Sequence, residues 1–134
     1  MIRKTILFLL LTACAMKGQT ISLLALPDTN VTHTPNSLLG TSMGIAKSFE
    51  DTLQLCMVTF PNKFVYEAYP RNQLPPSVSF EDAHSMFRSC VIGFRDIGHE
   101  MAGPYLLESL VYHTNNRSRT LVSQRFNLIL LDME

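Results

Sequence analysis

Apolar and polar residues alternate along the middle of the chain, which is the pattern of strands in a sheet and not of helices. In residues 52–60, Leu53, Leu55 and Met57 occupy one face, and the side chains between them occupy the other. Both faces carry apolar residues. This strand is therefore expected to be buried on one side and partly covered on the other.

Five further stretches show a strand pattern, several of them rich in β-branched and aromatic residues. They are residues 64–69, 77–80, 87–97, 105–112 and 120–131. Pro75 and Pro76 exclude a central strand between two of them, and residues 115–118 form a hairpin signal because asparagine tolerates left-handed backbone angles. About seven short strands with frequent turns predict an all-β fold, an antiparallel sandwich.

The first 20 residues have the features of a signal peptide. Arg3 and Lys4 precede an apolar run over residues 6–15, which is too short to span a bilayer. The basic start argues against the alternative of a buried first strand or helix. The predicted organisation is a signal peptide over residues 1–20, an extended N-terminal segment or irregular first strand over 21–41, and the sandwich over 42–134.

Residues 11–14, Leu-Thr-Ala-Cys, also resemble the lipobox of bacterial lipoproteins, in which the cysteine is lipidated. The protein is therefore expected to be secreted and extracellular, with a lipid anchor at Cys14 as the alternative. The apolar residues 128–131 are too few for a membrane span, so no transmembrane segment is expected.

Either form of processing leaves Cys56 and Cys90 as an even pair in an exported chain, and such pairs form disulfides. A bridge between them closes a loop of about 34 residues and stabilises the fold by roughly 3–4 kcal/mol in the chain-entropy model. Two free, buried thiols are the alternative.

Residues 100–107 (Glu-Met-Ala-Gly-Pro-Tyr-Leu-Leu) resemble the corner that enters strand F of immunoglobulin domains. In that family a tyrosine near the start of strand F bonds back to the upstream backbone, and here Tyr105 follows Gly103 with one residue inserted in the pattern. The resemblance implies a divergent extracellular immunoglobulin-like domain, loosely similar to secreted arthropod forms.

The resemblance also assigns residues 50–58 to strand B and residues 90–97 to strand E. Leu107 stands where the strand F cysteine is expected, and the sequence has no tryptophan for strand C, so Tyr66 or Tyr69 is expected to fill that volume. A Cys56–Cys90 bridge then joins two neighbouring strands of one sheet, and Leu107 replaces the missing sulfur contact by apolar packing.

Candidate chemistry is sparse. His33, His84, His99 and His113 share no metal-ligand spacing, and no phosphate-binding loop or paired catalytic carboxylates are present. The 11 basic and 11 acidic residues form no patch for nucleic acid. We expect no enzyme activity, no cofactor and no metal. Asn30 and Asn116 begin N-glycosylation sequons in predicted exposed segments.

The predicted function is therefore a secreted recognition module that binds an extracellular protein or cell-surface receptor. The alternative is an exported carrier or lipoprotein-type domain with a small hydrophobic ligand between its sheets, which needs a continuous apolar cavity. A recognition module is instead expected to fill its core with Leu55, Met57, Ile92, Tyr105, Leu107 and Phe126. The partner and the oligomeric state stay open.

Overall fold

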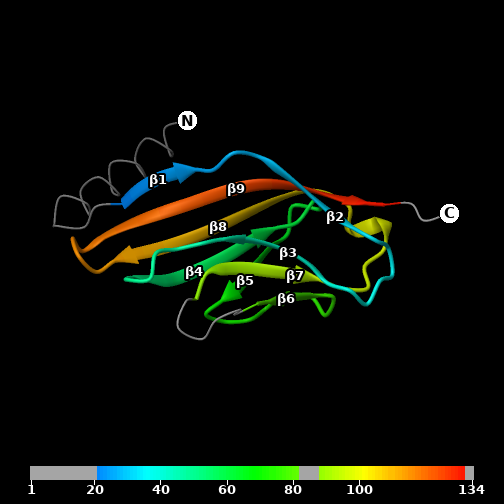
Figure 1. Cartoon of the computed structure of the whole chain (residues 1–134), viewed down its shortest axis with the longest axis horizontal. Helices are drawn as coiled ribbons and strands as arrows, with labels where there is room; N and C mark the ends of the chain where they lie inside the picture. Colours follow the sequence, from blue (N-terminus) through cyan, green and yellow to red (C-terminus); the bar gives the residue numbers. More distant parts are fainter. Residues whose placement is uncertain (1–20, 82–87, 132–134) are drawn as a thin grey trace.

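A computed structural model describes residues 21–81 and 88–131, which form a two-layered β-sandwich (Figure 1). The predicted signal peptide and Cys14 lie outside these residues. The strands are β1 (Ile21–Ala25), β2 (Thr29–His33), β3 (Thr41–Ile45), β4 (Asp51–Thr59), β5 (Val65–Tyr69), β6 (Val78–Phe80), β7 (Cys90–Phe94), β8 (Gly103–His113) and β9 (Ser118–Leu130). A short 3-10 helix, η1 (His99–Met101), precedes β8.

The larger sheet has the strand order β1-β9-β8-β4-β5, and β2 pairs with the second half of β9. The smaller sheet has the order β3-β7-β6. All pairings are antiparallel except those of β1 and β2, which run parallel to β9. The two sheets enclose the core between them, so the predicted all-β sandwich is confirmed.

This strand order is that of a variable-type immunoglobulin domain, in which G, F, C and C′ form one sheet and B, E and D form the other. The strands β9, β8, β4 and β5 take the first set of places, and β3, β7 and β6 take the second. The assignment of residues 50–58 to strand B is therefore wrong. The sequence pattern missed β3, whose glycine and small polar residues hide its strand character, and β3 occupies the place of strand B.

Residues 21–41 belong to the sandwich as well. The strands β1 and β2 lie along β9, and Val31 of β2 is buried in the core. Residue 42, the expected start of the sandwich, lies inside β3. The break between β1 and β2 falls at Pro27, whose carbonyl accepts a hydrogen bond from Gln124 Nε2 at 2.9 Å. That bond satisfies a polar side chain on an otherwise apolar face of β9.

An irregularity in β4 changes which of its residues face the core. The register between β4 and β8 shifts between Leu53 and Leu55. Because side chains alternate with a period of two, one extra residue moves the following side chains to the other face. Leu53, Cys56 and Val58 are buried, whereas Leu55 and Met57 are only partly buried. The expectation that Leu55 and Met57 fill the core is wrong for this reason.

Aromatic rings fill the centre of the sandwich. Tyr105 stacks on Phe126 at 5.0 Å between ring centroids, and Phe94 meets the edge of Tyr105 at 5.4 Å. Phe60 adds a further contact with Tyr105 at 5.1 Å. Ile92 and Leu107 are also fully buried, as the sequence predicted. The core is thus packed with rings that come from both sheets.

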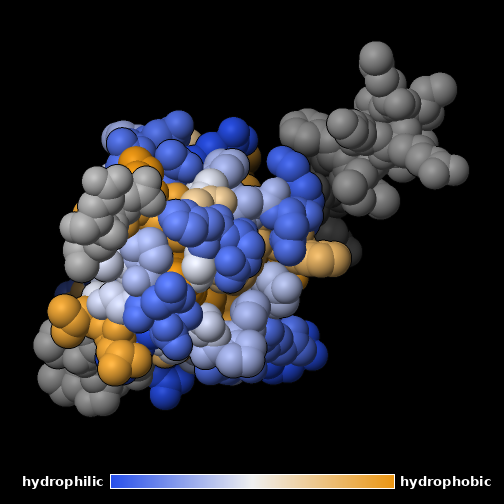
Figure 2. Space-filling view, turned by 90° about the vertical axis from the view of Figure 1, so that its right-hand side faces the viewer, coloured by the Kyte–Doolittle hydropathy of each residue, from blue (hydrophilic) through white to orange (hydrophobic). Residues whose placement is uncertain are grey.

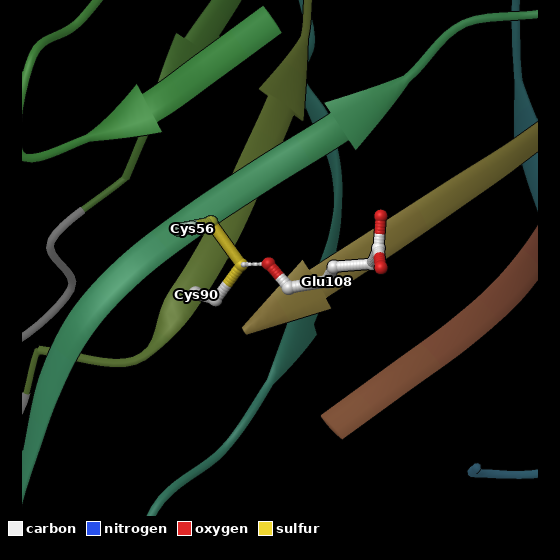
Figure 3. The surroundings of a disulfide bond; sticks show 3 residues. All are labelled: Cys56, Cys90 and Glu108. Carbon is white, nitrogen blue, oxygen red and sulfur yellow. Dashed lines mark hydrogen bonds between the residues drawn. A yellow bond between two sulfur atoms is a disulfide. The ribbon is translucent and has the colours of Figure 1, made fainter. Parts of the chain in front are cut away.

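The disulfide between Cys56 and Cys90 joins the two sheets (Figure 3). Cys56 lies in β4 of the larger sheet and Cys90 in β7 of the smaller one, so the expected staple within one sheet is wrong. Both cysteines are fully buried, and Cys90 Sγ lies 3.7 Å from the Glu108 carbonyl oxygen. The bridge comes from the strand C position, where immunoglobulin domains carry tryptophan. Tyr66 and Tyr69 lie on the neighbouring strand β5 instead.

Candidate functional site

The corner before β8 stabilises the fold through a buried tyrosine. The Tyr105 hydroxyl donates a 2.6 Å hydrogen bond to the Met101 carbonyl, as in the tyrosine corner of immunoglobulin domains. Gly103 has a φ of 130°, a region that side chains disfavour, and a Cβ there would lie 3.2 Å from Pro61. Leu107 is fully buried in the core. Burial raises the pKa of Tyr105, which keeps its hydroxyl protonated as a donor.

A polar concave surface lies at the other end of β8, where the β8–β9 hairpin meets the β3–β4 loop. This end is on the left in Figure 1, where the hairpin extends past the smaller sheet. A hollow of about 450 Å³ there is lined by Ser22, Ser48, Glu50, Asp51, His113, Asn115, Asn116, Ser118 and Thr120. We refer to this surface as the polar hollow. Its lining combines hydroxyls, amides and two carboxylates with a single imidazole.

Three side chains at the base of the polar hollow form a hydrogen-bonded relay. His113 Nδ1 lies 3.0 Å from Asp51 Oδ1, and His113 Nε2 lies 2.7 Å from Thr120 Oγ1. An ionised carboxylate only accepts hydrogen bonds, so a neutral imidazole carries its proton on Nδ1 and accepts the Thr120 hydroxyl proton at Nε2. These two hydrogen bonds fix the orientation of the His113 ring on β8, with one partner on β4 and the other on β9.

Strand pairing brings these side chains together. Asp51 and His113 are directly opposite each other in β4 and β8, and Thr120 is opposite Val111, one step along the same face. The Thr114 hydroxyl also donates a 2.9 Å hydrogen bond to the Glu50 carbonyl, which ties the hairpin to the β3–β4 loop. The base of the hollow is therefore built on regular strands and has a defined shape.

The order carboxylate, imidazole, hydroxyl is that of a hydrolase triad, but the surroundings do not complete one. Acyl transfer also needs donors aimed at the developing oxyanion, usually free backbone N–H groups. Thr120 lies where β9 pairs with β8 on one side and β1 on the other, so the local backbone groups are engaged in ladders. The relay is better suited to shape a binding surface than to catalyse a reaction.

The structure separates the histidines that the sequence singled out. His33 is buried on β2, His99 lies in η1, and His113 belongs to the relay, while His84 lies outside the described residues. Within residues 21–81 and 88–131, no cluster of three potential ligands could hold a metal ion. Sequence analysis missed the relay because Asp51 and Thr120 are far apart in the chain and only the β4–β8–β9 pairing brings them together.

The two sequon asparagines are both exposed. Asn30 lies on β2, and Asn116 lies in the turn between β8 and β9. Asn116 Oδ1 accepts hydrogen bonds from the backbone N–H of Ser118 at 3.1 Å and from its hydroxyl at 2.5 Å. Both side chains are thus accessible, and Asn116 borders the polar hollow.

The opposite end of the sandwich, seen in Figure 2, has a mixed surface with hydrophilic atoms between separate hydrophobic patches. Two smaller hollows of about 300 and 180 Å³ lie where β8 begins, and both are lined in part by Pro104 and Arg125. The charged side chains of the larger of the two are Asp28 and Arg125, and those of the smaller are Lys63 and Arg125. The polar hollow remains the best-defined candidate for binding in the part of the chain that the structure describes.

Comparisons with known proteins support the fold alone. No protein-family model and no curated protein matches the chain. Among solved structures, murine CRIg is similar with a TM-score of 0.58 at 7% sequence identity, and the match covers 77% of this chain and 92% of that one. At this identity the likeness shows an immunoglobulin-like sandwich and carries no residue roles. No helix among the described residues is long and apolar enough to cross a membrane.

Proposed function

We propose that this protein is a secreted, non-catalytic recognition module that binds an extracellular protein or cell-surface receptor through the end that carries the polar hollow. The observation that carries the proposal is the concave surface of about 450 Å³ with its fixed Asp51–His113–Thr120 relay. A preformed polar surface of this kind binds with less ordering of side chains than a mobile one.

The position of the hollow in the fold supports this reading by analogy. In variable-type immunoglobulin domains, the B–C and F–G loops lie at the end that contacts ligands. Here the β3–β4 loop and the β8–β9 hairpin take those places and line the hollow. A fold can host many functions, so the hollow itself is the evidence for binding, and the loop positions only support it.

The packed core weighs against the alternative of a carrier for a hydrophobic ligand. A ligand between the sheets needs space where Tyr105, Phe94 and Phe126 are in contact. The inter-sheet disulfide also occupies this layer. To admit a ligand, the two sheets would have to move apart, which breaks these ring contacts and is opposed by the disulfide.

Export is part of the proposal. The signal peptide over residues 1–20, the buried disulfide and the exposed sequons at Asn30 and Asn116 agree with an extracellular protein. The divergent, loosely arthropod-like character of the domain is likewise inferred from sequence resemblance. Intact mass of the protein recovered from culture medium tests these points, because it reports the cleavage site, attached glycans and a lipid at Cys14. A chain retained in cells at full mass would contradict secretion.

Binding is tested by screening the purified protein against a panel of extracellular and cell-surface domains, followed by two charge substitutions. Asn115→Arg places a bulky cation at the rim of the polar hollow and leaves the sequon at Asn116 intact. Leu39→Arg makes a comparable change at an exposed position in the β2–β3 loop, at the other end of the sandwich. We expect Asn115→Arg to abolish binding of the partner and Leu39→Arg to retain it. The reverse result would move the site to the other end.

A further inference from the structure

Strand β1 is unusual in that all five of its residues are exposed. It pairs with β9 on one side, and in the described part of the chain no strand pairs with its other side. Three of its five side chains are large and apolar, and Leu23 is 79% exposed. A strand edge of this kind presents unpaired backbone groups next to apolar side chains, which is a template for another strand.

Proteins usually protect such edges with charged residues, prolines or bulges. The sequence of β1, Ile-Ser-Leu-Leu-Ala, contains no charge and no proline, and its register with β9 is continuous from Ile21 to Ala25. Pro27 and Asp28 come only after the strand has ended. Among the residues that the structure describes, nothing pairs with this edge along the whole length of β1.

One backbone hydrogen bond shows which groups of β1 face outward. The Leu26 N–H donates to the Ser123 carbonyl of β9 at 2.8 Å. Because successive residues of a strand direct their backbone groups to opposite edges, Ser22 and Leu24 also face β9. The N–H and C=O groups of Ile21, Leu23 and Ala25 therefore point to the open edge. Leu23 is the middle residue of this set.

The side chains of β1 continue an apolar row across the outer face of the larger sheet. Leu23 is opposite Leu121, Leu121 is opposite Leu110, and Leu110 is opposite Leu55. Directly opposite residues share a face, so four leucines form one row across β1, β9, β8 and β4. The row ends at the open edge, where Leu23 has no apolar neighbour on its other side among the described residues.

We propose that two copies of this chain associate by antiparallel pairing of β1 with β1, with the two-fold axis beside Leu23. This register pairs Leu23 with Leu23 and Ile21 with Ala25, so all three outward-facing residues exchange backbone hydrogen bonds. A two-fold interface requires a self-complementary surface, and an antiparallel strand centred on an outward-facing residue has that property. The leucine row then runs without interruption from one protomer into the other.

The area available indicates how tight the association is. Five residues a side fall well short of the roughly 20–30 residues a side in a stable interface. The dimer is therefore reversible and depends on concentration. The hollow lies on the face of the larger sheet that carries Ser22, His113 and Thr120, whereas β1 pairs through its edge, so the pairing leaves the polar hollow of each protomer open. The dimer does not depend on what the polar hollow binds, and it shares with the proposed function only the removal of the signal peptide before β1.

Sedimentation of the mature, secreted protein over a range of concentrations tests the dimer. Leu23→Lys adds a charge at the two-fold axis, and Leu23→Pro removes an N–H that faces the open edge and not β9. Each substitution is expected to weaken dimerisation by about tenfold or more, because paired backbone groups or apolar contacts are lost. Leu38→Lys, at an apolar position that is 82% exposed in the β2–β3 loop, is the matched control and is expected to dimerise like the wild type.

A cysteine crosslink tests the register. Directly paired residues in an antiparallel ladder have Cα atoms about 5.5 Å apart, within reach of a disulfide. We expect oxidised Leu23→Cys to form a covalent dimer, whereas Ile21→Cys, which is opposite Ala25, forms none. Unchanged melting temperatures show that the variants are folded. A wild-type protein that stays monomeric at every concentration, a dimer that Leu23→Lys leaves intact, or equal crosslinking at both positions would overturn the proposal.

Discussion

The disulfide between Cys56 and Cys90 gives the most quantitative prediction about stability. Replacing both cysteines by alanine removes the covalent link between β4 and β7. The two residues are 34 positions apart, and for that loop length the chain-entropy model gives roughly 4 kcal/mol of lost stability. The two sulfur atoms are also fully buried, so their removal adds a packing cost on top of the entropic one.

Urea unfolding followed by circular dichroism measures this loss. For a domain of this size the slope of the free energy of unfolding is about 1–1.5 kcal/mol per molar urea. A loss of roughly 4 kcal/mol therefore lowers the unfolding midpoint by about 3 M. The slope itself is expected to rise in the double alanine variant, because an unfolded chain without the crosslink exposes more surface. The melting temperature is expected to fall by at least about 15 °C.

Either of two results would contradict this prediction. A double alanine variant that unfolds at the same urea concentration as the wild type would show that the bridge does not constrain the unfolded chain. A wild-type protein whose intact mass corresponds to two free thiols would refute the bridge directly. Ser109→Ala serves as the matched control, because it alters a buried side chain opposite Cys56 without touching either sulfur.

Three other substitutions test the corner and the core. Tyr105→Phe leaves the Met101 carbonyl without its hydrogen bond and is expected to lower the free energy of unfolding by about 1–3 kcal/mol in urea titrations. Burial raises the pKa of Tyr105, so its hydroxyl loses the proton more readily in the unfolded chain than in the folded one. The contribution of Tyr105 to stability is therefore fully present below about pH 10 and is lost as the pH rises further, and Tyr105→Phe is expected to remove this part of the alkaline loss. Gly103→Ala places a Cβ at a positive φ and against Pro61, so we expect a loss of about 1–3 kcal/mol, and an unchanged midpoint would contradict that strain. Ser109→Ala removes a buried hydroxyl that has no hydrogen-bond partner among the described residues, so the free energy of unfolding is expected to stay the same or rise by up to about 1 kcal/mol.

Sequence patterns located most of the strands. The tyrosine corner was recognisable because its residues are adjacent in the chain, and the two cysteines were recognisable because exported chains rarely keep free thiols. The faces of β4 were not predictable, since the irregularity after Leu53 reverses the alternation that places Leu55 and Met57 inside. A bulge of this kind depends on the partner strand β8 and leaves no reliable mark in the sequence of β4.

The candidate site illustrates the same limit. Asp51, His113 and Thr120 are ordinary polar residues in the sequence, and no motif links them. They meet because β4 and β9 both pair with β8, a non-local arrangement that a residue-by-residue pattern does not contain. The exposure of β1 is equally hidden, because its apolar residues alone predict burial.

The sequence by itself determined the all-β class, the position of most strands, the tyrosine corner and the pairing of Cys56 with Cys90. These features depend on local periodicity or on the small number of partners available to a residue type. Only the tertiary structure decided that β3 takes the place of strand B and that the disulfide therefore crosses between the sheets. It also decided that, within residues 21–81 and 88–131, no strand pairs with the outer edge of β1. Strand order is set by which apolar faces can be buried together, and that is a property of the whole sandwich and not of any one segment.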